Sequence, residues 1–318
     1  EILIGLVGSE MCIRDRSYLS LSLLCLLSAV SCIKEDLDAC PPEGGSVAVT
    51  IRVEKFRTRP PYAPEDLEEN VAARIHSLNY MLYADGRLLE QGRLDDVQAA
   101  EGNTYVYRHD PLPFGAYRLV FVANVTARMM TGNPDVPENY YIVYQGEGKG
   151  DDHFRADLPF EVTCPCSNAF ETVLQRVHGV TRFRFEQIPP EITSIEVSLD
   201  EVGQRTPLAG EPDLPCTVAK RVALADWASR TDGAFTLGTF STLPGARTSW
   251  RLKLYAGDET VPVYDRMVTD TLRIERNQLL ELTTRFKEDD FRGDIDFSVE
   301  VDTDWDGSNE GGGEVVIL

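Results

Sequence analysis

The sequence predicts an all-β protein with two tandem β-sandwich domains. Short segments in which apolar and polar residues alternate recur along most of the chain, and this period of two is typical of strands that bury one face. Clusters of proline and glycine, such as Pro189-Pro190 and Pro244-Gly245, separate these segments and predict turns. Many short strands joined by turns favour β-sandwiches.

The first sandwich is predicted over residues 46–168. The strand expected at Ser46–Val53 has clear alternation, and the strand expected at Ser77–Ala84 ends at the turn sequence Asp85-Gly86. A helix is predicted at Pro64–Ile75 because acidic residues occupy its first turn, where the helix dipole favours them. Further strands are expected at Thr104–Arg108, Gly115–Asn124 and Phe154–Val162.

The second sandwich is predicted over residues 169–318, after a break at Thr163–Phe170 in which the alternation stops. The alternation resumes beyond this break, again with turn residues between the segments. Strands are expected at Val180–Phe185, Thr193–Leu199, Phe235–Leu243, Ser249–Tyr255, Val261–Val268, Gln278–Phe286 and Asp294–Val301.

The C-terminal residues combine a flexible spacer with a short β-prone run. Asn309–Gly313 is rich in glycine, which predicts flexibility. The apolar residues Val315, Val316, Ile317 and Leu318 follow it, and an exposed run of this kind tends to aggregate. We therefore expect this run to occupy a groove, either in its own chain or in a neighbouring one.

The N-terminal residues predict an exported lipoprotein. Residues 1–16 resemble a translated sequencing adapter, so we treat them as an artefact outside the fold. Residues 17–31 are largely apolar, fall short of the roughly 20 residues of a membrane-spanning helix, and end in small residues directly before Cys32. This order is typical of a lipoprotein signal peptide, which is removed so that Cys32 is acylated at the new N-terminus. Residues 32–45 are then a lipidated tether.

The charge of the chain argues against one class of partner. The chain has 52 acidic and 31 basic residues, and its formal net charge is −21. Such a charge repels the phosphate backbone of nucleic acids, so we expect no nucleic-acid partner. The same charge suits a protein surface that faces the solvent.

Four cysteines follow Cys32 and are candidates for disulfides, because an exported protein keeps such bonds. They are Cys40, Cys164, Cys166 and Cys216. A bond between Cys164 and Cys166 would strain a very short loop, so the sequence favours a bond from this couplet to Cys40 or Cys216. The couplet lacks the two-residue spacing of common zinc knuckles, and no metal or cofactor is expected.

The sequence contains little evidence of an enzyme motif or of a calcium-binding loop. The sequence contains neither HExxH nor GxSxG, and we expect no catalytic residues and no enzymatic activity. Asp302–Gly307 resembles the beginning of a calcium loop. A bidentate glutamate is required at the twelfth position, but Gly313 stands there, which favours an acidic turn.

Three features together resemble a known family. The signal peptide leads directly into CIKEDLDACP, the stretch Leu112–Tyr117 leads into a strand that ends at Asn124, and a strand at Val299–Trp305 precedes a final short strand. These features resemble the FimB-type anchor subunits of type V fimbriae from Bacteroidota, which are lipoproteins similar to fimbrillins.

The resemblance implies two transthyretin-like β-sandwich domains in an outer-membrane lipoprotein at the base of a surface fimbria. Stalk subunits of such fimbriae lose their first strand, and the C-terminal strand of a neighbour fills the groove by β-strand addition. The anchor keeps its acyl chains and its first strand, so it ends the fibre. Its partner is the shaft fimbrillin.

The resemblance also assigns roles to residues. Cys32 matches the lipidation site, and Lys34, Glu35 and Asp36 are similar to the signal that exports such lipoproteins to the cell surface. Ser46–Val53 would be the retained first strand. Val315 to Leu318 would be either a donated strand or a last strand docked on its own chain.

Two alternative functions remain open. One is a surface glycan-binding lipoprotein, for which Tyr140, Tyr141 and Tyr144 are the candidate aromatic contacts. The other is a tip or adhesin subunit of the same fimbria, which would need no lasting acyl anchor at Cys32.

Overall fold

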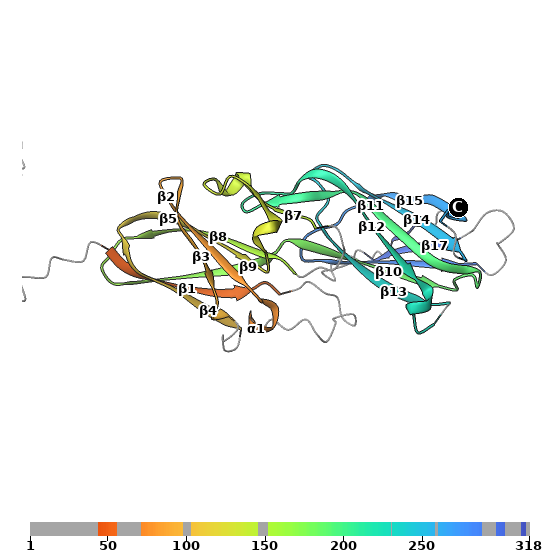
Figure 1. Cartoon of the computed structure of the whole chain (residues 1–318), viewed down its shortest axis with the longest axis horizontal. Coiled ribbons are helices and arrows are strands. Elements are labelled where there is room, and N and C mark those ends of the chain that lie inside the picture. The colour runs from red at the N-terminus through yellow and green to blue at the C-terminus, as the bar shows by residue number, and fades with distance from the viewer. Residues whose placement is uncertain are drawn as a thin grey trace, which may run out of the picture. The chain divides into compact units, whose positions relative to one another are not determined.

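The structure is a computed structural model, and it is almost entirely β-structure (Figure 1). This confirms the predicted all-β class. The residues that it describes are 44–55, 71–97, 103–145, 152–229, 231–257, 260–287, 297–302 and 313–315. Within these ranges, no helix has the length and apolar character needed to cross a membrane.

The strands are named in chain order. In the first half of the chain they are β1 (Gly44–Val53), β2 (Leu78–Ala84), β3 (Arg87–Leu94), β4 (Thr104–Pro113), β5 (Gly115–Ala123), β6 (Met130–Gly132), β7 (Tyr140–Val143), β8 (Phe154–Val162) and β9 (Ser167–Arg176). In the second half they are β10 (His178–Glu186), β11 (Ile192–Pro207), β12 (Asp213–Ala223), β13 (Gly233–Phe240), β14 (Thr248–Ala256), β15 (Tyr264–Leu272), β16 (Leu279–Phe286), β17 (Phe297–Asp302) and β18 (Gly313–Val315). The helices are short: α1 (Val71–Arg74), η2 (Ala127–Met129), η3 (Pro137–Asn139) and η4 (Leu224–Asp226).

Most predicted strands are present, with bounds that differ by a few residues. The strand predicted at Phe154–Val162 is β8, and the helix predicted at Pro64–Ile75 appears in the described residues as the single turn α1. Five further strands were not predicted, namely β3, β6, β7, β9 and β12. Most side chains of β3 are exposed, so this strand lacks the buried alternation on which the prediction relied.

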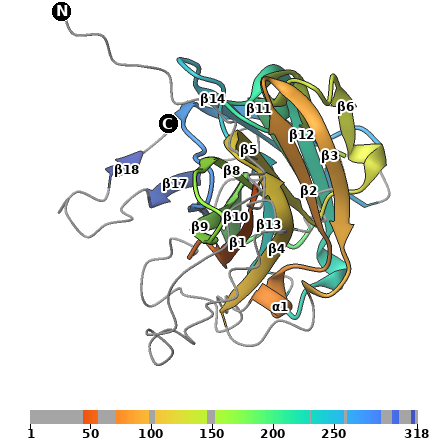
Figure 2. The ribbon, with the colours of Figure 1, turned by 90° about the vertical axis from the view of Figure 1, so that its left-hand side faces the viewer.

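The first group of strands forms a sandwich around one core. Their hydrogen-bonded order is β3-β2-β5-β8-β9-β1-β4. The rings of Tyr107 on β4 and Phe121 on β5 lie 5.5 Å apart edge to face, although these strands are not neighbours in the sheet. The sheet therefore folds over itself, with Val49, Ile51 and Leu82 among the buried residues of the core. Figure 2 shows β1 beside β4 on one side of this core.

The second group of strands forms two facing layers. One layer has the order β13-β10-β16-β17-β18, and the other has the order β15-β14-β11-β7-β6 with β12 paired to β11 (Figure 1). Trp250 on β14 is fully buried, and its ring lies 5.4 Å from that of Phe183 on β10. The aromatic contact joins the two layers in one core.

A third apolar cluster lies between these groups. Val120 and Val122 on β5 pack in it with Ile142, Leu208 and Phe240. The residues from Pro42 onward form one compact unit, and β9 runs without interruption through residue 168. The division into sandwiches at residues 46–168 and 169–318 stays a prediction.

Candidate functional site

The first strand, β1, lies in the interior of its sheet. Ser46–Val53 pairs in parallel with Ser167–Leu174 of β9. On its other side, β1 pairs antiparallel with β4, from Gly44 opposite Pro113 to Arg52 opposite Thr104. Both edges of β1 are therefore occupied, and its removal would expose two unpaired strand edges.

The side chains of β1 bind it to the core as well. Val47, Val49, Ile51 and Val53 are at most 8% exposed, and they alternate with residues on the opposite face. Burial of an aliphatic side chain of this size contributes about 1.5–3 kcal/mol. The alternation also fixes the register, since a shift by one residue would turn every apolar side chain away from the core.

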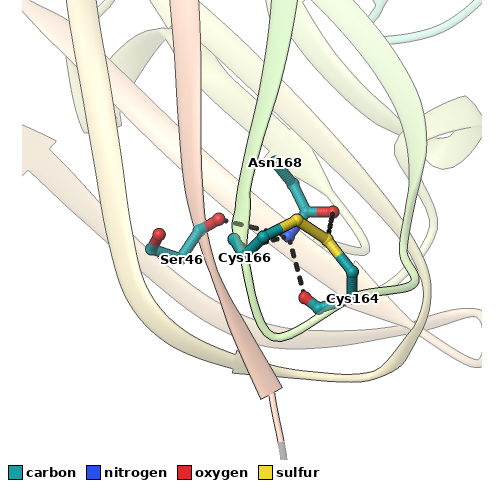
Figure 3. Close-up of a disulfide and its surroundings, with 4 residues drawn as sticks. All are labelled: Ser46, Cys164, Cys166 and Asn168. Carbon is teal, nitrogen blue, oxygen red and sulfur yellow. Dashed lines mark hydrogen bonds between the residues drawn. A yellow bond between two sulfur atoms is a disulfide. The ribbon is translucent and has the colours of Figure 1, made fainter.

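A disulfide-bonded turn lies against the start of β1 (Figure 3). Cys164 and Cys166 are bonded to each other, and their Cα atoms are 5.2 Å apart, within the usual range for a disulfide. This corrects the expectation that the couplet bonds Cys40 or Cys216. The bend between β8 and β9 brings the two residues together across Pro165, whose ring fixes its backbone φ angle. Cys40 lies outside the described residues.

Asn168 connects this turn to β1. Its side-chain Nδ2 donates to the carbonyl oxygens of Ser46 at 3.3 Å, Cys164 at 3.3 Å and Cys166 at 3.0 Å (Figure 3). A Cβ atom on Gly45 would collide with the carbonyl of Cys164, so the close approach requires glycine. We call Gly45, Ser46, Cys164, Cys166 and Asn168 the disulfide clasp.

Cys216 lies apart from the clasp. It is a free cysteine on β12, and its thiol donates a weak hydrogen bond to the carbonyl oxygen of Gly203 at 3.5 Å. Burial raises the pKa of this thiol. The protonated, non-nucleophilic form is therefore favoured, which suits a structural residue.

A cluster of charged and polar groups fixes the other end of β1. Glu54 follows β1 directly, and its carboxylate accepts hydrogen bonds from Arg276 at 2.7 Å and from the backbone N–H of Arg176 at 3.2 Å. The Asn277 side chain donates to the carbonyl of Lys55 at 2.7 Å and accepts from Arg176 at 3.2 Å. We call Glu54, Lys55, Arg176, Arg276 and Asn277 the charged joint.

Two buried histidines lie beside the charged joint. The rings of His153 and His178 are 4.8 Å apart, and His178 stacks on Phe240 at 4.7 Å. Burial lowers the pKa of His178 well below its ordinary value of 6.5, and the nearby His153 and Arg176 lower it further. His178 is therefore uncharged near neutral pH. Neither these histidines nor the charged joint was predicted from the sequence to form a site.

The C-terminal strand pairs with its own chain. β18 is antiparallel to β17, with Val315 opposite Val299 and Gly313 opposite Val301 (Figure 2). In the part of the chain that the structure describes, β18 ends its sheet and has a neighbour on one side. Val316, Ile317 and Leu318 lie outside the described residues, so the choice between a donated and a self-docked strand stays open.

Other predicted site residues also lie outside the described part of the chain. They are Cys32, Lys34, Glu35, Asp36 and most of the acidic turn that follows Asp302. Their assigned roles stay predictions. Within the described residues, no three His, Cys, Asp or Glu side chains gather as ligands of a metal ion would.

The candidate glycan-binding tyrosines do not form one platform. The ring of Tyr141 lies 3.9 Å from the guanidinium carbon of Arg205. Tyr144 is half-buried, and its hydroxyl donates to the carbonyl of Gly238 at 3.1 Å. Tyr140 lines a separate cavity. Tyr140 and Tyr144 also pack against the third apolar cluster, whereas Tyr141 packs on Arg205, so the three rings do not present one shared face.

The chain matches a protein-family model over most of its length. The model of the family described as "Fimbrillin-A associated anchor proteins Mfa1 and Mfa2" matches residues 37–310. No curated protein matches the sequence significantly.

Solved structures share the fold. A candidate polysaccharide-binding protein from Bacteroides thetaiotaomicron has a TM-score of 0.58 at 11% identity, covering 82% of this chain and 96% of its own. The fimbrial anchor protein Mfa2 from Porphyromonas gingivalis has 0.53 at 10% identity, covering 81% and 97%. A candidate adhesin from Bacteroides ovatus has 0.54 at 10% identity, covering 81% and 92%. At these identities the similarity shows the fold alone.

Proposed function

Because the chain belongs to the family of fimbrillin-A associated anchor proteins, we propose that it anchors a fimbria to the outer membrane and ends its assembly. The family points to a structural protein that is not an enzyme. In this proposal the acylated Cys32 inserts its lipid chains into the membrane, and Lys34 to Asp36 direct export to the surface. Two or three acyl chains are sufficient for firm membrane binding.

The position of β1 is the observation that carries the proposal. A subunit within a fibre made by strand addition must offer an open groove to its neighbour's strand. Here the groove is filled by β1, which is paired on both edges and fixed at both ends by the disulfide clasp and the charged joint. A chain that keeps β1 accepts no further strand there, so it is suited to the end of a fibre.

The C-terminal run is the proposed contact with the shaft fimbrillin. Val315 to Leu318 follow the glycine-rich residues of Asn309–Gly313, which permit the run to reach away from the chain. The short pairing of β18 with β17 is a resting position in this proposal. Main-chain hydrogen bonds in the groove of a fimbrillin would replace this pairing when the fibre forms.

Isolation from native envelopes tests the proposal. The protein carries an internal tag, and mass spectrometry identifies its N-terminus and its co-purifying proteins. We expect that Cys32 is acylated and that the anchor still contains residues 46–53. We also expect it to form a heat-resistant complex with a fimbrillin. Deletion of residues 315–318 is expected to abolish the complex while acylation remains.

Two controls make the outcome specific. Cys32→Ala is expected to release the protein from the membrane, whereas Cys216→Ala removes a free thiol from β12 and leaves the membrane fraction unchanged. An acylated protein without any fimbrillin would overturn the anchor role. A complex that survives deletion of residues 315–318 would overturn the donated strand.

A further inference from the structure

A cavity of about 420 Å³ lies on the outer face of β2, β3 and β5. Ser77, Asn79 and Met81 project to one face because successive side chains of an extended chain alternate. Met81 lies opposite Gln91 of β3, and Asn79 lies opposite Val122 of β5, so these residues share that face. The segment around η2 and the side chain of Tyr140 complete the wall.

The floor of the cavity is apolar. Met81, Val122 and Val125 line it and are at most 4% exposed. Their side chains belong to the apolar cluster that joins the two groups of strands, so tertiary packing holds them in place. A ligand that enters this cavity therefore meets a fixed aliphatic surface.

The wall offers polar groups that have no hydrogen-bond partner within the described part of the chain. Among the described residues, no hydrogen bond engages the side chains of Ser77, Gln91, Thr126 or Tyr140. Asn79 donates its amide to the carbonyl of Val125 at 3.2 Å, which leaves its Oδ1 as an acceptor. Asn79 lies on β2, Gln91 on β3 and Tyr140 on β7, and Thr126 lies in the segment that follows β5. A concave apolar site with a few convergent polar groups is the usual form of a small-molecule site.

The kind of polar group selects the ligand. Arg93 is the charged side chain of the lining, and it pairs with Asp95 at 3.0 Å on the exposed rim. The available partners are otherwise hydroxyls and amides, which match a ligand that carries hydroxyls and no net charge. An aliphatic floor matches the C–H face of a sugar ring. Ligand pockets span about 300–1,000 Å³, so this cavity is small and suits one or two rings.

We propose that this cavity binds a neutral sugar unit, with its C–H face on Met81, Val122 and Val125 and its hydroxyls directed to Gln91 and Tyr140. The function is additional to membrane anchoring. The cavity lies on β2, β3 and β5, and none of these strands is a hydrogen-bonded neighbour of β1 or of β18. Binding therefore does not depend on the proposed anchor role.

Saturation-transfer NMR on the full chain tests the proposal. The probes are methyl glycosides of glucose, galactose, mannose, fucose and N-acetylglucosamine, with glucuronic acid and N-acetylneuraminic acid as charged comparators. We expect transfer to at least one neutral glycoside and weaker transfer to the charged sugars. Absence of transfer to every neutral glycoside, or stronger transfer to the charged sugars, would overturn the proposal.

Variants locate the binding to this cavity. Tyr140→Phe combined with Gln91→Ala removes two polar contacts, and we expect affinity for the bound glycoside to fall by about tenfold or more. Thr126→Trp adds bulk at an exposed wall position and is expected to block binding. Tyr141→Phe is the matched control, since its ring packs on Arg205 outside the cavity, and it should bind as the parent does. Equal affinity in the parent and the double variant, at unchanged thermal stability, would reject this site.

Discussion

Glu54 and Arg276 form an ion pair at 2.7 Å although 222 positions separate them in the chain. The contact fixes the end of β1 to the segment that precedes β16. The Glu54 side chain is 18% exposed and that of Arg276 is 35% exposed, so water screens the pair less than it screens a fully exposed one. This relationship links the end of β1 to residues in the last quarter of the chain.

Glu54→Gln is expected to destabilise the protein by about 1–2 kcal/mol. The substitution removes the charge that pairs with Arg276 and weakens the bond to the backbone of Arg176; hydrogen bonds to charged groups contribute about 1.5–3 kcal/mol before this partial exposure is considered. Urea unfolding measures the change. The matched control is Glu171→Gln on β9, whose 3.5 Å pair with Arg52 is largely exposed and should contribute little. Equal effects of the two substitutions would contradict a special role for Glu54.

Asn168→Ala is expected to loosen the start of β1. The substitution leaves the carbonyls of Ser46, Cys164 and Cys166 without their side-chain donor, which costs about 1–3 kcal/mol. Hydrogen exchange should accelerate in the amides of residues 46–49 more than in those of β14. Asn133→Ala serves as the control, because the Asn133 side chain accepts a hydrogen bond only from the nearby backbone N–H of Asp135 among the described residues. Unchanged exchange in β1 would show that the clasp does not hold the strand.

Ile51→Ala is expected to lower the free energy of unfolding by about 2–5 kcal/mol. Ile51 is fully buried, so the shorter side chain leaves a cavity between β1 and the facing layer. Thr50→Ala is the control on the opposite face of the same strand, and its effect should be much smaller. Chemical denaturation measures both. In cells, we expect Ile51→Ala to increase proteolytic loss of the first strand, and intact β1 in that variant would count against retention by core packing.

The buried His178 is expected to make stability depend on pH. The pKa of His178 is about 6.5 in the unfolded chain and well below that value in the folded protein. As the pH falls below 6.5, the unfolded chain therefore binds a proton that the folded protein does not. The folded state therefore has its full stability above pH 6.5 and loses stability as the pH falls below that value. Between pH 7.5 and pH 5 the loss amounts to up to about 2 kcal/mol for this one group.

His178→Phe tests the origin of this pH dependence. Phenylalanine keeps the stacking on Phe240 and does not titrate, so the loss between pH 7.5 and pH 5 should shrink. The titratable groups that act on His178 are His153 and Arg176. Asp152 lies nearby, since it forms ion pairs with Arg176 and Arg74. His76→Gln alters an exposed histidine and should leave the dependence as it is. An unchanged slope in His178→Phe would assign the effect to another group.

The sequence predicted strands well where one face is buried. The alternation of Ser46–Val53 gave both the position and the inward face of β1, because burial and period-two patterning coincide there. β3 and β12 have mostly exposed or half-exposed side chains, so nothing in their hydrophobic pattern marks them as strands. Their pairing depends on the neighbouring strands β2 and β11 instead.

The site was less accessible from the sequence than the fold. The predicted bond from Cys164 or Cys166 to Cys40 or Cys216 was wrong, because the bend between β8 and β9 places the Cα atoms of Cys164 and Cys166 5.2 Å apart. The charged joint depends on contacts over 101 to 222 positions, and a local pattern carries no information about such pairs. The cavity beside Tyr140 likewise exists only when β2, β3 and β5 are assembled.

The placement of β1 also determines how the protein responds to force. A pull on Gly44 that is directed along the axis of β1 would load the hydrogen bonds to β4 and β9, which lie across that axis. These bonds are then sheared together, whereas an edge strand pulled sideways would separate one bond at a time. A tether attached at this end would therefore share its tension between two neighbouring strands at once.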